Sequence, residues 1–220
     1  MIDDDAALPE PSKLTQTKER WAREGRLPSR LQTRPNPERL PPGQHAVNDW
    51  PVLDLGQTPE VTRDQWRLEM IGAVFQPAIW NWEQLMQQPR SVARTDIHCV
   101  TSWSRYDNEW EGISTLDLID AVQPHGTAQF VVLHSYDGYT TNLTIEDFMT
   151  EGAMLVYAWN GAPLTAAHGG PARLVVPHLY FWKSAKWIRK IEFRTKDAPG
   201  FWETRGYHNR GDPWNEERYS

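Results

Sequence analysis

Short segments with strand-like patterns recur along most of the chain after residue 60. Residues 66–71 and 91–98 alternate apolar and polar positions, which is the period of a strand with one buried face. Four further segments rich in apolar and aromatic residues predict strands at residues 130–133, 154–159, 174–176 and 187–193. The pattern therefore predicts a strand-rich domain.

Three short helices are predicted in the connections, each from the residue that caps its N-terminus. Asn81 followed by Gln84 forms a capping-box pattern, and Pro89 ends the helix that this pattern opens. Ser114 caps a second helix, and Thr144 caps a third. Because strands and helices do not alternate regularly, a parallel βαβ fold is not predicted.

Turn signals complete the pattern. Asp137-Gly138 is typical of a hairpin, so residues 139–141 are expected to pair back onto the preceding strand. Asn160-Gly161 predicts another turn, and the polar residues 101–112 are expected to form a loop. We therefore expect an α+β fold, with a mixed, partly barrel-like sheet and short helices.

The two ends of the chain differ from its middle. A short helix is predicted over residues 17–24, and the prolines that follow deny residues 28–45 a continuous helix. We expect residues 1–45 to form an N-terminal arm and residues 46–195 to form one domain. Residues 196–220 contain several aromatic side chains among charges, so we expect this tail to pack on the domain.

Charge and cysteine content exclude several classes of function. Lys+Arg 23 against Asp+Glu 29 gives a net charge of -6, so nucleic acid is not expected as a partner. A single cysteine excludes an internal disulfide and any site with several cysteine ligands. The acidic start does not fit a secretory signal, and the longest apolar run, residues 153–159, is too short to span a membrane. We therefore expect a cytoplasmic protein.

Cys99 is the first candidate for chemistry. It ends a predicted strand after His98 and precedes a segment with Trp103, Arg105 and Trp110. A thiolate is a soft metal ligand, and nearby positive charge favours the thiolate form. Two other interpretations stay open at this point: a small buried hydrophobic side chain, which is common for free cysteine, and a cysteine protease, for which no local signature is present.

The second candidate is the segment 168–187. Gly169-Gly170-Pro171 allows a close approach of the backbone to a ligand. Hydrogen-bond donors typical of a phosphate or anion cradle follow at Arg173, Lys183, Ser184 and Lys186. A solvated basic strand face would have the same composition. The 12 tryptophans of the chain fit either core packing or the walls of a dry pocket.

Together the two segments resemble a known family, the sulfite-oxidase-like molybdopterin-dependent oxidoreductases, and its small single-domain bacterial and archaeal members in particular. The resemblance covers roughly residues 40–195 and is most specific in the block 168–177, where residue types and spacing agree. The matching elements are His98-Cys99-Val100, Trp103-Ser104, Trp110-x-Gly112, Asn160-Gly161-x-Pro163, the block 168–177 and Lys183-Ser184-x-Lys186-Trp187.

The resemblance implies a molybdenum–molybdopterin cofactor (Mo-MPT), with Cys99 as the one protein ligand of the metal. The residues implied to hold the pterin and its phosphate are His168, Arg173, Lys183, Ser184 and Lys186. Gln44 and His45 fall where the family's entering chain also touches the cofactor. Tyr139 aligns with a tyrosine that faces the metal, and Arg105 is a candidate contact for a substrate anion.

The implied activity is oxygen-atom transfer on a small oxyanion, sulfoxide or N-oxide, with electrons exchanged with a separate partner. The Cys-x-x-x-Trp-Ser form of residues 99–104 is closer to periplasmic methionine-sulfoxide reductases than to sulfite oxidases. We expect no haem domain, no C-terminal immunoglobulin-like domain and no twin-arginine signal. The family pattern favours the plain pterin. A cofactor carrier without turnover and a tryptophan-rich protein-interaction domain are the alternatives.

Overall fold

The computed structural model describes residue 16 and residues 38–220. The predicted helix over residues 17–24 and most of the predicted arm lie outside the described residues. Packing begins before residue 46, because Leu40 has no exposed surface and β1 (His45–Val47) pairs in parallel with a strand of the domain.

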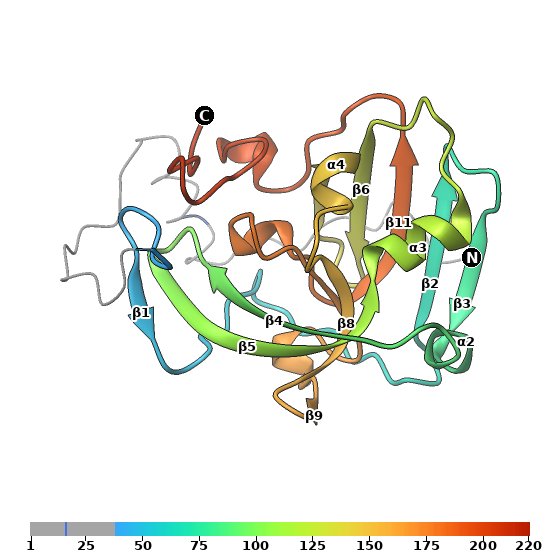
Figure 1. Cartoon of the computed structure of the whole chain (residues 1–220), viewed down its shortest axis with the longest axis horizontal. Helices are drawn as coiled ribbons and strands as arrows, with labels where there is room; N and C mark the ends of the chain where they lie inside the picture. Colours follow the sequence, from blue (N-terminus) through green and yellow to red (C-terminus); the bar gives the residue numbers. More distant parts are fainter. Residues whose placement is uncertain (1–15, 17–37) are drawn as a thin grey trace.

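The first of two sheets has six strands. Its order is β1-β5-β8-β10, with β4 paired to β5 and β9 paired to β8. Apart from the parallel pair β1 and β5, its strands pair in antiparallel fashion. The strands with bounds not yet given are β4 (Ser91–His98), β5 (Trp103–Ser114), β8 (Met154–Trp159), β9 (Ala162–Pro163) and β10 (Arg173–Val175). Figure 1 shows β4 and β5 as a long curved pair along one side of the molecule.

The second sheet has five strands in the order β3-β2-β11-β6-β7. Its central pair, β2 and β11, is parallel, while the outer pairs are antiparallel. Its strands are β2 (Arg67–Gly72), β3 (Ala78–Asn81), β6 (Phe130–Ser135), β7 (Thr140–Thr144) and β11 (Ile188–Arg194). The α+β class with mixed sheets is confirmed, but neither sheet closes into a barrel.

Short helices occupy the connections, as the capping patterns predict. Asn81 Oδ1 accepts from Gln84 N at 2.9 Å while Gln84 Oε1 accepts from Asn81 N at 2.9 Å, which is a complete capping box. Ser114 and Thr144 also cap their helices through side-chain oxygens. The helices are α2 (Trp82–Met86), α3 (Thr115–Val122), α4 (Ile145–Phe148) and the single-turn 3-10 helices η1 (Ala166–His168), η2 (Phe181–Lys183) and η3 (Glu203–Arg205). Among the described residues, no helix combines the length and apolar character that crossing a bilayer requires.

The prediction of a loop at residues 101–112 is wrong. Apart from a turn at its start, this segment belongs to β5, which pairs with β1, β4 and β8. Asp107 and Glu109 are exposed, whereas Ser104, Asn108 and Trp110 have no exposed surface and Ile113 is 1% exposed. Backbone pairing with three neighbours therefore determines a strand here, against the polar composition.

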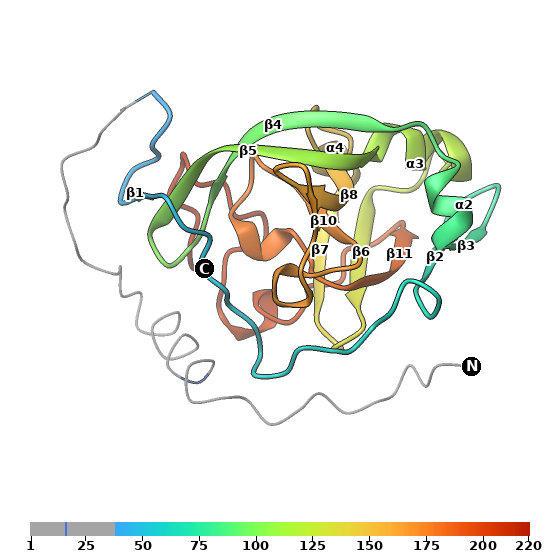
Figure 2. The same cartoon turned by 90° about the horizontal axis from the view of Figure 1, so that it is seen from below.

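The C-terminal tail packs on the domain through its aromatic residues. Phe201, Trp202 and Tyr207 are buried, whereas Trp214 is 46% exposed. The tail reaches the segment before β1, where Arg218 Nη2 donates to Pro42 O at 3.2 Å, and Figure 2 shows the C-terminal end in the half of the molecule that contains β1. The tail is thus part of the packed structure around the cavity.

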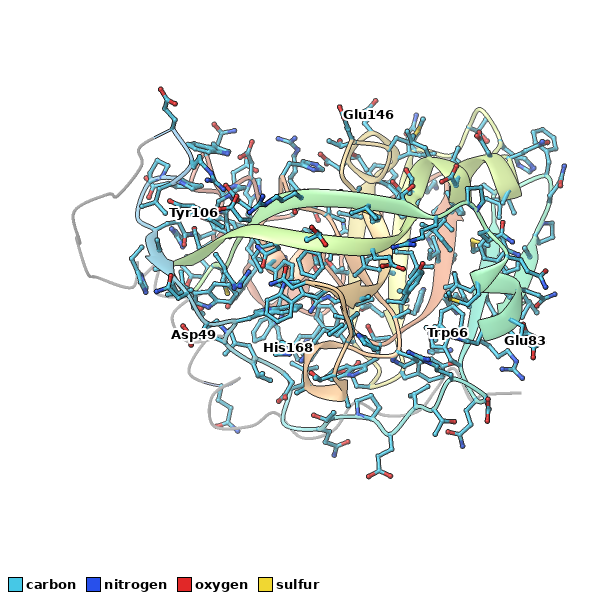
Figure 3. The ribbon with its side chains drawn as sticks, turned by 60° about the horizontal axis from the view of Figure 1, so that its bottom comes forward. Asp49, Trp66, Glu83, Tyr106, Glu146 and His168 are labelled. Atoms are coloured by element: carbon cyan, nitrogen blue, oxygen red, sulfur yellow. The ribbon has the colours of Figure 1, made fainter. Side chains whose placement is uncertain are left out.

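Charged side chains such as Glu83 and Glu146 point away from the body of the protein (Figure 3).

Candidate active site

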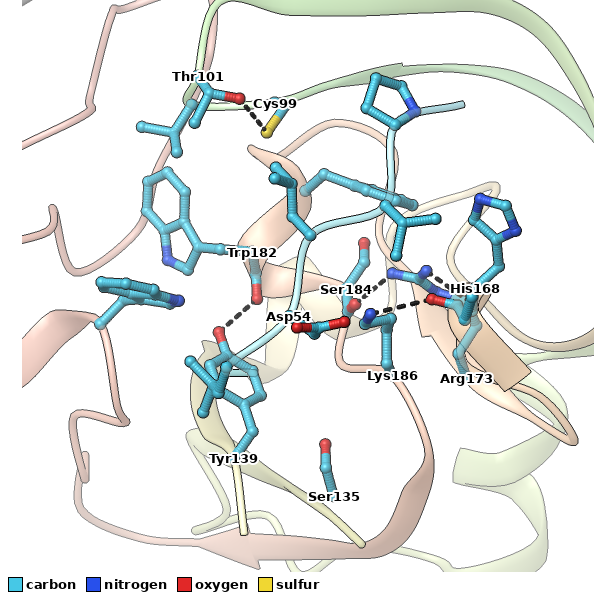
Figure 4. Close-up of a pocket in the computed structure, with 18 of the residues that line it drawn as sticks. Asp54, Cys99, Thr101, Ser135, Tyr139, His168, Arg173, Trp182, Ser184 and Lys186 are labelled. Atoms are coloured by element: carbon cyan, nitrogen blue, oxygen red, sulfur yellow. Dashed lines mark hydrogen bonds between the residues drawn. The ribbon is translucent and has the colours of Figure 1, made fainter. Parts of the chain in front are cut away.

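One cavity of the described residues combines most of the predicted site residues. It contains about 830 Å³ of empty space, part of it open to solvent. Figure 4 shows a close-up of its lining side chains. These side chains come from six segments that are far apart in sequence: residues 50–55, 99–103, 135–139, 167–173, 181–187 and 202–207.

Cys99 borders this cavity from a tight turn that follows β4. Cys99 N donates to Trp103 O at 2.8 Å, and Ser102 N donates to Cys99 O at 3.0 Å. The side chain is 6% exposed, and its Sγ lies 3.1 Å from Thr101 Oγ1. Cys99 therefore packs against the core on one side and faces the cavity on the other, as a ligand thiol must.

A cysteine-protease arrangement finds no support in the described residues. The thiol has Thr101 as its hydrogen-bond partner, and no histidine in the part of the chain that the structure describes bonds to it. The neighbouring His98 instead places Nδ1 2.8 Å from Ser104 Oγ. Burial lowers the pKa of His98 to about 4, so its imidazole stays neutral at pH 7.

Arg173 supplies a buried cation at another wall of the cavity. It is 3% exposed, and it donates from Nη1 to His168 O at 2.9 Å and from Nη2 to Ser184 O at 2.6 Å. Burial lowers its pKa to about 9, so the guanidinium remains charged at neutral pH. The described residues give it no ion pair. A buried charge without a counter-ion is costly, so this wall is suited to an anionic ligand.

Lys186, His168 and Ser184 line the cavity with Arg173. Lys186 Nζ donates to Ala167 O at 3.0 Å and lies 4.1 Å from the ring centroid of Trp187. Figure 4 places Arg173, Lys186 and His168 together, on the side away from Cys99 and Thr101. The cavity thus has a cationic side and a thiol side.

The His168 ring is fixed by the segment that crosses the cavity. It stacks on Trp50 with ring centroids 4.1 Å apart, and its Nε2 lies 3.1 Å from Trp50 O. Burial lowers its pKa, and the charges of Arg173 and Lys186 add to that effect although the Trp50 carbonyl opposes it. A neutral imidazole at this position leaves Arg173 and Lys186 as the cationic groups that face a ligand.

Aromatic side chains form a further part of the lining. Tyr139 lies in the cavity lining, as predicted, and its hydroxyl donates to Trp182 O at 2.7 Å. Burial raises the pKa of Tyr139 well above its usual value, so the phenol stays protonated. Trp103 also lines the cavity, whereas Trp110 is fully buried and bonded to Thr95 Oγ1 at 2.9 Å. Tyr139 and Trp103 thus contribute aromatic surface to the cavity walls.

Gln44 and His45 are not among the cavity-lining residues. Gln44 Nε2 donates to Cys99 O at 3.0 Å, and His45 N donates to Ser102 O at 2.9 Å. Both residues therefore hold the turn of residues 99–102, which carries the thiol, from outside the cavity lining.

Arg105 and Lys183 also lie away from the cavity lining. The Arg105 guanidinium lies 4.7 Å from the ring centroid of Trp159 and bonds to Asn108 Oδ1. Lys183 has no exposed surface, and its Nζ lies 2.7 Å from Glu203 Oε1 and donates to Asn142 O at 2.9 Å. The structure thus does not bring these two cations to the cavity.

The lining also contains residues that the sequence did not mark as site residues, among them Trp50, Asp54 and Asp137. Asp137 was visible only as part of a hairpin signal, and burial raises its pKa while the Tyr139 amide and the Lys186 charge oppose that rise. Nothing in the local pattern around Trp50 and Asp54 marks them as site residues. Their segment has neither helical nor strand periodicity and reaches the cavity by crossing it.

Comparison with known proteins gives consistent matches. A family model described as "Oxidoreductase molybdopterin binding domain" matches residues 55–202. The uncharacterized oxidoreductase YuiH of Bacillus subtilis (strain 168) is 46% identical over 185 residues, covering 83% of this chain and 92% of YuiH. The protein-methionine-sulfoxide reductase catalytic subunit MsrP of Ralstonia nicotianae is 28% identical over 153 residues, covering 62% of this chain and 46% of MsrP.

A solved structure supports the fold. The sulfane dehydrogenase SoxCD from Paracoccus pantotrophus superposes with a TM-score of 0.61 at 21% sequence identity. The match covers 66% of this chain and 42% of the SoxCD chain. This chain thus spans less than half the length of both MsrP and the SoxCD chain.

Proposed function

Because this chain belongs to the oxidoreductase molybdopterin-binding family, we propose that it is an enzyme that transfers an oxygen atom to or from a small sulfur- or nitrogen-oxide substrate. The proposed cofactor is molybdenum–molybdopterin in its plain form. A separate electron-transfer partner and a cytoplasmic location belong to the same proposal.

The residues of the cavity fit such a cofactor. The observation that carries the proposal is the buried Arg173 guanidinium, which lines the same cavity as the chain's one cysteine and has no carboxylate partner among the described residues. Nor do those residues contain a group of three or more His, Cys, Asp or Glu side chains that could hold a metal. A metal at Cys99 would therefore take most of its ligands from an organic group.

The chain's own residues divide the work of binding. Arg173, Lys186 and Ser184 would bind the anionic part of the cofactor, and Cys99 would contribute one thiolate to the metal. Trp182 and Tyr139, which are joined by a 2.7 Å hydrogen bond, form a rigid wall that excludes water from the thiol side. When bound, the cofactor supplies the two-electron redox chemistry at molybdenum.

The position of the cations favours a neutral oxide as substrate. Arg173 and Lys186 lie on the side of the cavity away from Cys99 in Figure 4, and Arg105 does not line the cavity. An oxyanion such as sulfite would be expected to require a cation beside the metal. The thiol side instead presents Thr101 and indole rings, which suit a sulfoxide or N-oxide. The name of the MsrP relatives agrees with this preference.

The first test is the cofactor content of the purified chain. We expect about one molybdenum and one pterin per chain, and Arg173→Met should lower both at least tenfold because the anion contact is lost. Arg205→Met is the matched control, since Arg205 also donates to a carbonyl, that of Phe201, and also lies over an aromatic ring, but does not line the cavity. Native protein without molybdenum would refute the proposal.

The second test separates substrates and functions. With a reduced dye as electron donor, sulfoxides or N-oxides should be turned over, and sulfite with a dye acceptor should react at least tenfold more slowly. Turnover of sulfite alone would overturn the neutral-substrate assignment. Full cofactor content without turnover of any of these compounds would indicate a cofactor carrier instead.

A further inference from the structure

We propose that Arg218, in the tail beyond the family-matched residues 55–202, is a positioning residue for Cys99. The inference rests on the proposed role of Cys99 as metal ligand. The sequence gives no sign of it, because Arg218 lies 119 positions after Cys99 in a charged segment that ends the chain.

The contacts of Arg218 converge on the turn that carries the thiol. Its side chain is 1% exposed, and Nη1 donates to Val100 O at 2.6 Å while Nη2 donates to Pro42 O at 3.2 Å. The guanidinium carbon lies 4.9 Å from the ring centroid of Tyr180. Since Val100 directly follows Cys99, the guanidinium holds the Val100–Thr101 peptide, one residue beyond the cysteine.

The turn requires support from outside. Ser102 has a φ of 74°, the left-handed region that residues with a side chain seldom adopt. Such a conformation persists when the surroundings hold it. Three carbonyls of the turn accept hydrogen bonds from groups outside it: Cys99 O from Gln44 Nε2, Val100 O from Arg218 and Ser102 O from His45 N.

The N-terminal segment packs closely on the guanidinium. A Cβ placed on Gly43 would lie 3.0 Å from Arg218 Nη2, and Gly43 has a φ of +69°. A glycine is therefore needed where the N-terminal segment passes over the guanidinium. Residues 42–45, the Cys99 turn and the tail are thus packed around one side chain.

The tail also connects Arg218 to the aromatic wall of the cavity. Tyr207, which lines the cavity, forms an isolated bridge with Tyr219, the residue after Arg218. Tyr207 in turn packs on Trp202 with ring centroids 4.7 Å apart. A shift of the tail would therefore move the thiol and this aromatic wall together, and small displacements of reacting groups cost large factors in rate.

The test uses Arg218→Met, which keeps most of the volume, and Arg218→Lys, which keeps the charge. A lysine can reach one carbonyl but cannot bridge Val100 O and Pro42 O as the planar guanidinium does. Arg205→Met is the matched control, because Arg205 lies in the same tail with the same kinds of contact but not at the turn.

The first readout is independent of the cofactor. In the full chain freed of cofactor, iodoacetamide can modify cysteine 99 alone, so its rate reports local opening of the turn. We expect the rate to rise at least tenfold in Arg218→Met and less in Arg218→Lys, and to stay within twofold in Arg205→Met. Equal rates in native protein and Arg218→Met, or equal acceleration by the control, would overturn the proposal.

The second readout uses the loaded enzyme and decides the question if the cofactor-free variants do not fold. Arg218→Met should retain molybdenum but change its paramagnetic resonance spectrum, with kcat reduced at least tenfold and KM within twofold. An unchanged spectrum with unchanged kcat would refute the positioning role. Absence of molybdenum from native protein would refute the proposed function, but the alkylation result would still decide whether Arg218 holds the turn.

Discussion

Two buried cations from one stretch of sequence have opposite surroundings. Lys183 has the Glu203 carboxylate at 2.7 Å and lies away from the cavity lining. Arg173 has carbonyl partners and lines the cavity. The charge of Lys183 is compensated within the fold, whereas an uncompensated buried charge at a cavity wall is suited to an anionic ligand. At the scale of single residues, the presence or absence of a carboxylate partner distinguishes a structural cation from one suited to bind a ligand.

Cys99→Ser should abolish turnover while the fold is retained. Serine has nearly the same volume, but its hydroxyl is a poor ligand for a soft metal. We expect kcat to fall at least 100-fold and the melting temperature of the cofactor-free chain to change by less than about 3 °C. Dye-linked assays and thermal unfolding measure both. Full turnover in a cofactor-loaded Cys99→Ser preparation would show that the thiolate is not the ligand.

His134 on β6 should make the protein less stable in acid. Burial lowers its pKa to about 4, and the Lys190 charge contributes, although Glu192 opposes the shift. Between about pH 6.5 and 4 the unfolded chain therefore binds a proton that the folded chain does not. Stability must fall as the pH falls through that window, by at most about 3 kcal/mol from this residue.

His134→Gln removes this titration and can still donate to Glu192. Urea unfolding at a series of pH values should give a shallower loss of unfolding free energy between pH 6.5 and 4 than in native protein. Titratable groups that the two proteins share contribute equally to both pH dependences, so the difference reports on His134. Identical slopes would show that His134 titrates normally in the folded state.

At the scale of elements, β5 organises the site. Its first residue, Trp103, lines the cavity and bonds to the Cys99 amide, and its far end lies against β8. There Gly112 allows the backbones of β5 and β8 to approach closely, because a Cβ on Gly112 would lie 2.1 Å from Leu155 O and 2.7 Å from Val156 Cα. The path of β5 therefore depends on a residue without a side chain, far from the cysteine that it helps to place.

Gly112→Ala should destabilise the protein strongly. The methyl group would overlap backbone atoms, which cannot move without displacing β8, so we expect a loss of at least about 2 kcal/mol of unfolding free energy. Gly126→Ala is the matched control, since nothing lies within 4 Å of its added Cβ. The control should stay within about 0.5 kcal/mol of native protein in urea unfolding. Equal stabilities of the two variants would contradict the close approach.

At the scale of the whole molecule, the cavity exists because distant segments meet. Its lining extends from Trp50 to Tyr207, and much of it comes from connections between strands. A ligand that fills this space and neutralises Arg173 binds the folded chain alone. Binding and global stability must then be linked.

Removing the cofactor should lower the melting temperature. A ligand at about 1,000 times its Kd adds about 4 kcal/mol, which corresponds to roughly 8–16 °C for a chain of this size. Calorimetry of loaded and cofactor-free protein measures the difference, which should shrink in Arg173→Met. Equal melting temperatures of the two native forms would argue against a tightly held ligand.

The local features of this protein follow from its sequence alone. The bounds of β4 and β8, the capping box at Asn81 and the hairpin at Asp137-Gly138 follow from periodicity and from contacts within a few residues. The family motifs around Cys99 and Arg173 can also be identified from sequence, because they are short strings with fixed spacing. Features that depend on residues close in sequence can therefore be predicted before the fold is known.

Which side chains come into contact depends on the tertiary structure. The polar segment after Cys99 becomes a strand because three other strands pair with it. Lys183 has Glu203 as its partner, and Arg218 reaches the Cys99 turn from the other end of the chain. These outcomes depend on contacts between residues far apart in sequence, whose energy is shared among many segments, and no local pattern records them.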